Sequence, residues 1–500
     1  MMIDTREETT MKRFLLILCA FMLMVCGALA EDRRDEAHRY SGVGPVSEGF
    51  TWATIWDGEE DKDWFDEGMA YVIDVHGNRL TDETYAVSNR YFSNGLVTVY
   101  KDGKAGCIDR SGSVAIPFEF YEIYGFSSVG YALAALGDDW SSARWGVIDR
   151  QGQWVIPAEW DDAVVRVPSW DDPGVPDEEK ERLAIVWKDG LAGILNMQGE
   201  TVLPCEYVIW LIDSFQEGRL PVKREGAGYG YVNEHGEIVI PCQWTYGSVF
   251  SEGLARVLDG MKSGYIDPDG HLVISLPDGW IARGDFHDGL ALVENDQGLY
   301  GYIDQTGALV IPFQWEKADS FSESVAQVWQ DGKCGFINTA GEIIIPFQWK
   351  DARTAQEGHI VVMDESGLWG MINLTGNLTV PCAYKEIDSI EQQVYQMADV
   401  IDGRTLYGLI GADGTVICPC CWSLVSSSAT DGILQVCLGY TRMADYDAWN
   451  GQEPTTGFIS INGDVIVPCE YDHGYYRNGY FTLIQDGYLT ILDRDGNLVF

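Results

Sequence analysis

Residues 301–315 read Gly-Tyr-Ile-Asp-Gln-Thr-Gly-Ala-Leu-Val-Ile-Pro-Phe-Gln-Trp, and versions of this stretch recur along most of the chain. We call the first Gly of each version the anchor glycine. A second Gly lies six residues after every anchor, and a Pro lies eleven residues after nine of the ten anchors. The anchors are Gly106, Gly146, Gly193, Gly230, Gly264, Gly301, Gly335, Gly370, Gly408 and Gly457. Fixed spacing inside the motif with variable spacing between motifs predicts a rigid hairpin unit joined by adjustable connections.

The residues within the motif explain why it should form a hairpin. The Asp304 side chain can accept hydrogen bonds from the backbone two residues on, and Gly307 tolerates a positive φ, so residues 304–307 predict a tight turn with a glycine bulge. β-Branched and aromatic residues on both sides favour strands. Pro312 is expected to end the second strand, because it has no N–H to donate. The anchor Gly301 is expected where a neighbouring backbone or ring comes close.

A third strand signal precedes each hairpin, as in residues 250–257, so each unit is expected to hold about three short antiparallel strands. The sequence predicts an all-β tandem array of about twelve such units, with degenerate capping units at Tyr71–Gly77 and Thr490–Phe500. An elongated or superhelical solenoid is the first expectation, and one or two β-propellers are the alternative. Aromatic residues after the Pro are expected to pack between units: Trp160, Tyr207, Trp244, Trp315, Trp349, Tyr384, Trp422 and Tyr471.

These motifs resemble the WG repeat, also called the KWG-type or WG-containing repeat, of a bacterial family. Trp145-Gly146 and Trp369-Gly370 carry the dipeptide that names the repeat, and the resemblance covers roughly residues 65–500. It implies a β-rich repeat protein, often exported. It implies no catalytic residues.

The N-terminal residues indicate export. Residues 1–30 are expected to be a signal peptide, with Met11 as a candidate start, a basic pair, an apolar run and a small-residue cleavage site. Lipid anchoring through Cys26 is the less favoured alternative, because Val25 before it is too large for a good lipidation box. Residues 31–64 are expected to be an acidic linker and residues 65–500 the repeat array. A secreted or extracytoplasmic location follows, with no transmembrane span.

Charge restricts the partners. The chain holds 33 Lys and Arg against 77 Asp and Glu, a formal net charge of −44. Such a charge argues against nucleic acid and anionic membrane surfaces, whose phosphates would repel it.

The sequence holds no motif for a catalytic, cofactor or metal site, and the chain is predicted to be non-enzymatic, with no cofactor. Asn replaces the turn Asp in several units, which a turn cap tolerates and a general acid would not. Five Cys that follow the motif Pro stand where other units have Phe or Ala, which favours buried filler, with disulfides between neighbouring units left open. They are Cys205, Cys242, Cys382, Cys420 and Cys469.

Two insertions are the candidate partner-binding loops. Residues 138–143 contain Trp140, and Tyr440–Thr456 contains Tyr446, Trp449 and Asn450. Both interrupt the equivalent connection of their units, and loops on a repeat scaffold often carry binding specificity. The leading hypothesis is therefore an exported, non-catalytic binding surface for protein or cell-wall glycan. A surface spacer is the alternative, and a glycan-acting enzyme is a third hypothesis.

Overall fold

A computed structural model describes residues 40–55, 69–86, 92–165, 183–209, 215–260, 262–439 and 454–500. All regular elements in these ranges are β-strands, arranged in ten antiparallel sheets. Two sheets have seven strands and each spans two units, so the described residues form twelve repeats, which we number in chain order. The expected all-β array of about twelve units is confirmed. Among the described residues, no helix is long and apolar enough to cross a membrane.

The strands divide among the repeats as follows. Repeats 1 to 4 are β1 (Tyr40–Val43), β2 (Phe50–Ile55) and β3 (Met69–Asp74); β4 (Tyr85–Ala86), β5 (Leu96–Lys101), β6 (Lys104–Asp109) and β7 (Val114–Phe120); β8 (Glu122–Ile123), β9 (Tyr131–Leu136), β10 (Arg144–Asp149) and β11 (Trp154–Trp160); β12 (Asp162–Val165), β13 (Leu183–Lys188), β14 (Leu191–Asn196) and β15 (Thr201–Val208). Repeats 5 to 8 are β16 (Arg219–Arg224), β17 (Gly228–Asn233) and β18 (Ile238–Trp244); β19 (Tyr246–Ser251), β20 (Leu254–Asp259), β21 (Lys262–Ile266) and β22 (Leu272–Ser275); β23 (Ile281–Ala282), β24 (Leu290–Glu294), β25 (Tyr300–Asp304) and β26 (Leu309–Trp315); β27 (Lys317–Ala318), β28 (Val325–Gln330), β29 (Lys333–Asn338) and β30 (Ile343–Trp349). Repeats 9 to 12 are β31 (Asp351–Ala352), β32 (His359–Met363), β33 (Trp369–Asn373) and β34 (Leu378–Tyr384); β35 (Glu386–Glu391), β36 (Val394–Ile401), β37 (Arg404–Gly411) and β38 (Val416–Trp422); β39 (Leu424–Val425), β40 (Ile433–Leu438), β41 (Thr455–Ser460) and β42 (Val465–Tyr471); β43 (His473–Arg477), β44 (Tyr480–Gln485) and β45 (Tyr488–Asp493).

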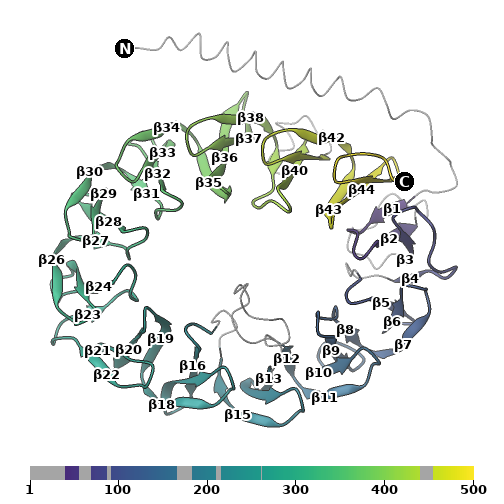
Figure 1. The fold of residues 1–500 in the computed structure, drawn as a ribbon, viewed down its shortest axis with the longest axis horizontal. Helices are drawn as coiled ribbons and strands as arrows, with labels where there is room; N and C mark the ends of the chain where they lie inside the picture. The colour runs from purple at the N-terminus through teal and green to yellow at the C-terminus, as the bar shows by residue number, and fades with distance from the viewer. Residues whose placement is uncertain are drawn as a thin grey trace.

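The repeats stand around a wide central opening, and the first and last described repeats lie side by side (Figure 1). The backbone N–H of Tyr40 in β1 donates to the carbonyl of Gly487 at 2.6 Å. Two side chains of repeat 12, Asn478 and Thr482, donate to carbonyls of repeat 1. Ile484 packs in one apolar cluster with residues of β1, β2 and β3. The array is therefore a single closed ring, which is the propeller-like alternative of the sequence analysis.

A typical repeat has one more strand than the sequence indicated. In repeat 8 the sheet order is β27-β28-β29-β30, where β27 is only Lys317–Ala318. Figure 1 places the first strand of such a repeat toward the central opening and the last at the outer rim. A two-residue strand has no periodicity of its own, which explains why the three-strand expectation missed it.

The expected end of the strand at Pro312 is wrong, because β26 continues to Trp315. Tyr302 pairs with Ile311 and Tyr300 with Trp315, so a bulge that contains Pro312 lies between these pairs. β26 is an edge strand of its sheet. A Pro is tolerated there because the missing N–H leaves no ladder bond unmade.

This bulge accounts for the anchor glycine. A Cβ on Gly301 would lie 2.6 Å from the carbonyl oxygen of Ile311, on the bulged neighbouring strand. The same contact with the residue before the Pro recurs at Gly335 and Gly370. The expected close backbone approach is confirmed.

The turn glycines join each repeat to the one before. Gly307 has a φ of +82°, and a Cβ there would lie 3.0 Å from the Ile274 side chain of repeat 6. Gly341 and Gly376 meet Ile311 and Ile345 of their preceding repeats in the same way. The hairpin turn therefore also packs against the adjacent repeat.

The core lies between neighbouring sheets. One cluster combines Tyr302, Ile311 and Trp315 of repeat 7 with Phe321 and Val328 of repeat 8. All eight aromatic residues after the motif Pro belong to such clusters, as expected for packing between units.

The structure differs from the expected linker at residues 40–55. β1 and β2 pair with each other, and β2 pairs with β3, so these residues belong to repeat 1. Tyr40, Val43 and Ala53 are buried. The acidic residues around these short strands obscured them, and repeat 1 begins before the predicted boundary at residue 65.

Candidate functional site

Of the four predicted loop residues, the structure describes Trp140 alone; Tyr446, Trp449 and Asn450 lie outside the described residues. Trp140 follows β9 with 68% of its surface exposed, and its ring packs edge-on against buried Trp145 at 5.8 Å. Asp139 accepts hydrogen bonds from Ser141 and Ser142 and stabilises the loop. The predicted second insertion included Thr455 and Thr456, but these belong to β41.

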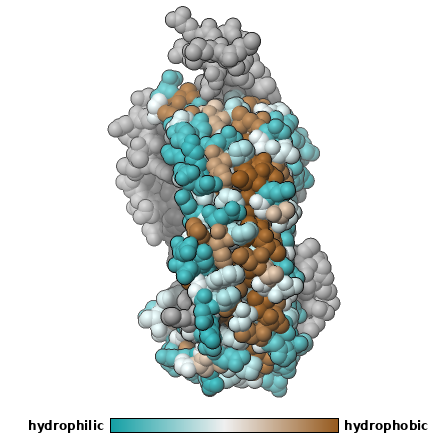
Figure 2. Space-filling model, turned by 90° about the vertical axis from the view of Figure 1, so that its left-hand side faces the viewer, coloured by the Kyte–Doolittle hydropathy of each residue, from teal (hydrophilic) through white to brown (hydrophobic). Residues whose placement is uncertain are grey.

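The outer rim carries a second candidate surface that sequence reasoning missed. In eight repeats the residue two positions after the turn glycine is an exposed aliphatic side chain, with 37–64% of its surface accessible. We call these residues the aliphatic belt: Val114, Ile238, Leu272, Ile343, Leu378, Val416, Val465 and Leu498. Figure 2 shows a hydrophobic band along the rim, bordered by hydrophilic residues.

A bulge explains why alternation did not reveal the belt. In repeat 8, Ile337 pairs with Ile343 while the adjacent Phe336 pairs with Ile345, so two residues of β30 take the place of one. Ile343 is therefore exposed and Ile345 is buried, although residues two apart in a regular strand share a face. The aliphatic residue two positions after nine of the twelve turn glycines was the signal available in the sequence.

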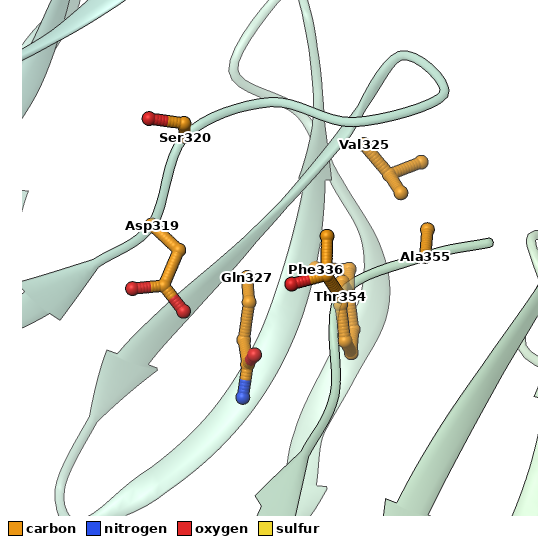
Figure 3. Close-up of a pocket in the computed structure, with 7 residues that line it drawn as sticks. All are labelled: Asp319, Ser320, Val325, Gln327, Phe336, Thr354 and Ala355. Atoms are coloured by element: carbon orange, nitrogen blue, oxygen red, sulfur yellow. The ribbon is translucent and has the colours of Figure 1, made fainter. Parts of the chain in front are cut away.

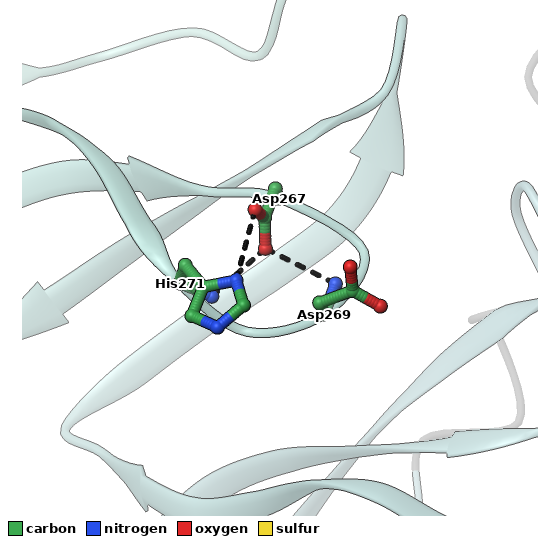
Figure 4. Close-up of side chains that lie close together, drawn as sticks. All are labelled: Asp267, Asp269 and His271. Atoms are coloured by element: carbon green, nitrogen blue, oxygen red, sulfur yellow. Dashed lines mark hydrogen bonds and ion pairs between the residues drawn. The ribbon is translucent and has the colours of Figure 1, made fainter.

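One turn brings together three side chains that could ligate a metal ion: Asp267, Asp269 and His271 (Figure 4). The Asp267 carboxylate already accepts hydrogen bonds from the backbone N–H groups of Asp269 and His271, and it lies 3.2 Å from His271 Nδ1. Asp304 caps the equivalent turn of repeat 7 through Thr306 and Ala308. The cluster is explained as a turn cap.

The turn carboxylates have shifted pKa values for the same structural reason. The Thr306 hydroxyl, with backbone donors, lowers the pKa of Asp304. Asn338 makes the same cap in repeat 8 by accepting from the backbone of Ala340 and Glu342. Because Asn338 accepts the same backbone hydrogen bonds as Asp304, the role of the Asp304 carboxylate is to accept hydrogen bonds in the turn.

Seven cysteines in the described ranges are free thiols: Cys107, Cys205, Cys242, Cys334, Cys382, Cys437 and Cys469. The Sγ atoms of Cys205, Cys242 and Cys469 each lie 3.7–3.9 Å from a backbone carbonyl of the same repeat. Burial raises the pKa of Cys469 to about 12. These thiols are packed filler with little nucleophilic thiolate.

Comparisons with known proteins follow the repeat architecture. The family described as "WG containing repeat" matches residues 106–140, 145–165, 229–260, 300–334, 335–366, 369–396 and 457–488. A search of the curated proteins finds no match. The fold and these seven segments define a closed ring of β-sheet repeats. The chain carries WG-containing repeats at these seven positions.

Three solved structures are similar to parts of the chain at low sequence identity. The crystal structure of BamB from Moraxella catarrhalis has 13% identity and a TM-score of 0.27, covering 59% of this chain and 91% of that chain. KlHsv2 with loop 6CD replaced by a Gly-Ser linker has 8% identity and a TM-score of 0.25, covering 53% and 92%. The tricorn protease has 8% identity and a TM-score of 0.19, covering 91% and 61%. Likeness at these TM-scores carries no argument about function.

Proposed function

We propose that this chain is an exported, non-catalytic ring that binds another protein through its outer rim. The observation that carries the proposal is the aliphatic belt, which exposes an apolar side chain at the same position of eight repeats, including repeats 8 to 12 in succession. A contiguous apolar surface bordered by polar residues is typical of protein or membrane contact sites. The charge of −44 disfavours an anionic membrane.

The belt favours protein over glycan. Its side chains are aliphatic and have no hydrogen-bonding groups for sugar hydroxyls. The repeated aromatic residues, which would have supported a sugar platform if exposed in rows, lie in the clusters between sheets. We therefore expect a partner with an apolar contact surface and basic residues around it, because opposite charge favours encounter with this acidic chain.

Export is part of the proposal and is supported by the basic and apolar residues near the N-terminus. Trp140 adds an exposed aromatic side chain in one inserted loop. The second inserted loop is a further contact candidate, and its deletion should stop before Thr455 so that β41 stays complete.

Site-specific photo-crosslinking in producing cells tests the rim proposal. A photoreactive residue at Leu378 in the belt should form a protein adduct, while the same residue at exposed Glu386 near the central opening should not. The captured protein is then purified and its affinity measured by calorimetry. We expect the combined variant Ile343→Thr, Leu378→Thr and Val416→Thr to bind at least about tenfold more weakly.

The Thr substitutions place a β-branched side chain, which favours strands, at three exposed positions, so thermal unfolding should change little. Equal adducts at Leu378 and Glu386, no adduct at any belt position, or unchanged affinity of the Thr variant would each refute the rim proposal.

A further inference from the structure

A small cavity opens between repeats 8 and 9, and the repeat pattern explains its origin (Figure 3). Repeats 7 and 8 place a buried Phe before the second strand, Phe286 and Phe321. These rings lie edge-on to Tyr265 and Tyr302 at 4.8 and 4.9 Å. Repeat 9 has Ala355 at this position, so space that an aromatic ring fills elsewhere is left open.

Two residues of repeat 8 that line this cavity are polar, whereas the equivalent residues of repeat 7 are not. At the interface of repeats 7 and 8, Leu292 packs in one apolar cluster with Phe321. The position equivalent to Leu292 in repeat 8 is Gln327, and the position equivalent to Gly284 is Asp319. Both line the cavity. The interface between repeats 7 and 8 is therefore apolar and filled at this position, whereas the interface between repeats 8 and 9 is polar and contains a cavity.

The Gln327 side chain lacks a hydrogen-bond partner for its donor. Only 4% of Gln327 is exposed, and within the described residues its Nε2 atom has no partner. The Cys334 thiol adjoins this amide, but sulfur is a weak acceptor. A buried amide without an acceptor is costly, which indicates that a group outside the chain completes it.

The other polar groups define what that group must be. Burial raises the pKa of the Asp319 carboxyl, which lines the same cavity as the Gln327 amide. Figure 3 shows both side chains directed to one side of the loop. The exposed Thr354 hydroxyl adds to the polar lining, whereas the Ser320 hydroxyl points away from it, toward Gly284 of repeat 7 (Figure 3). The cavity volume is about 10 Å³, close to the need of one water-sized group.

We propose that this cavity binds one hydroxyl group of a neutral sugar or polyol, which accepts from Gln327 Nε2 and donates to Asp319. Water fills the position when no ligand is present. An ammonium group cannot accept the Gln327 hydrogen bond, and an anionic group would face Asp319. Thr354, at the exposed mouth, then meets a neighbouring hydroxyl of the same ligand, which favours a vicinal diol over an isolated alcohol.

Glycerol and methyl glucoside are suitable probes, with 1,4-dioxane as a control that has oxygens but no hydroxyl, and methylamine as a cationic control. The readout is the side-chain amide signal of Gln327 in full-length protein labelled at its Gln amides. The signal is assigned by its loss in Gln327→Leu. We expect a saturable shift with glycerol and methyl glucoside and none with dioxane or methylamine.

Ala355→Phe restores the ring found in repeats 7 and 8 and should abolish the saturable shift. Thr354→Val, at the exposed mouth, should weaken binding at least about threefold if Ala355→Phe does not fold. No saturable shift with either polyol, an equal shift with dioxane or methylamine, or an unchanged shift in Ala355→Phe or Thr354→Val would overturn the proposal. These outcomes are independent of the aliphatic belt, so they leave the rim proposal untouched.

Discussion

The backbone N–H of Gly289 donates a 2.9 Å hydrogen bond to the carboxylate of Glu252, which belongs to the preceding repeat. Glu217 and Glu323 make the same bond to Gly253 and Gly358. Each of these carboxylates extends from a residue with positive φ, 51–54°. The acidic residue of the turn thus joins its repeat to the next one by a hydrogen bond, which we call the clasp. Part of the large negative charge therefore has a structural role.

Glu252→Ala should loosen this clasp. The lost bond is charge-assisted but exposed, so we expect a loss of about 0.5–1 kcal/mol and faster amide hydrogen exchange at Gly289. Glu225→Ala is a suitable control, since Glu225 is an exposed acidic turn residue of the same ring. Equal exchange at Gly289 in the wild type and Glu252→Ala would contradict the clasp.

Gly301→Ala should destabilise repeat 7 by about 1–3 kcal/mol, because the added Cβ meets the Ile311 carbonyl oxygen at 2.6 Å and the bulged strand must move. Urea unfolding measures the change. Gly42→Ala is the matched control, since its Cβ would have only ordinary contacts, the nearest at 3.6 Å. If both variants lose the same stability, close strand approach is not what the anchor requires.

Thr482→Val should weaken ring closure. The Thr482 hydroxyl is fully buried and donates to the Gly44 carbonyl at 2.8 Å, so its loss should cost about 1–2 kcal/mol. Hydrogen exchange should increase in β1 and β44, while the interface of repeats 7 and 8 stays protected. Adding Asn478→Ala, which removes a second closing bond, should enlarge the effect. Uniform exchange around the ring would argue against a localised joint.

His473 should make stability fall with acidity. Burial lowers its pKa to about 4, below the value of about 6.5 expected in the unfolded chain. Between these values the unfolded chain binds a proton that the folded chain does not, so stability declines as pH falls from about 6.5 toward 4. Above this window the group has no effect.

Two neighbours act in the opposite direction, because burial raises the pKa of Glu470 and Asp472. The test is therefore the difference between wild type and His473→Gln in urea unfolding across this pH range. The wild type should lose stability more steeply than the variant. Parallel curves for wild type and His473→Gln would contradict the prediction.

The sequence predicted the features that local chemistry determines. The turn at Asp304 and Gly307, the close approach at Gly301 and the repeat count follow from residue types at fixed spacing. Features set by tertiary packing were missed. β27 is too short to leave a pattern in the sequence, and Pro312 is tolerated because its strand lies at the edge of its sheet. Ring closure between repeats 1 and 12 depends on the summed orientation of all repeats.

The candidate sites were harder to predict for the same reason. Exposure of Ile343 results from a bulge, which reverses the face that alternation assigns. The cavity beside Gln327 requires knowing that Ala355 occupies a position held by Phe elsewhere, and that the two residues face each other across repeats. Of the predicted loop residues, the structure describes only Trp140, and its side chain is exposed.

Each terminal repeat builds its sheet from its own end of the chain: β1, β2 and β3 at the start, β43, β44 and β45 at the finish. No strand is exchanged between the first and last described sheets; they close by lateral contact alone. Duplication or loss of a unit that forms its own sheet, such as repeat 8, would therefore leave every remaining sheet whole. Only the circumference would change, so this architecture can vary its size without inventing a new way to join its ends.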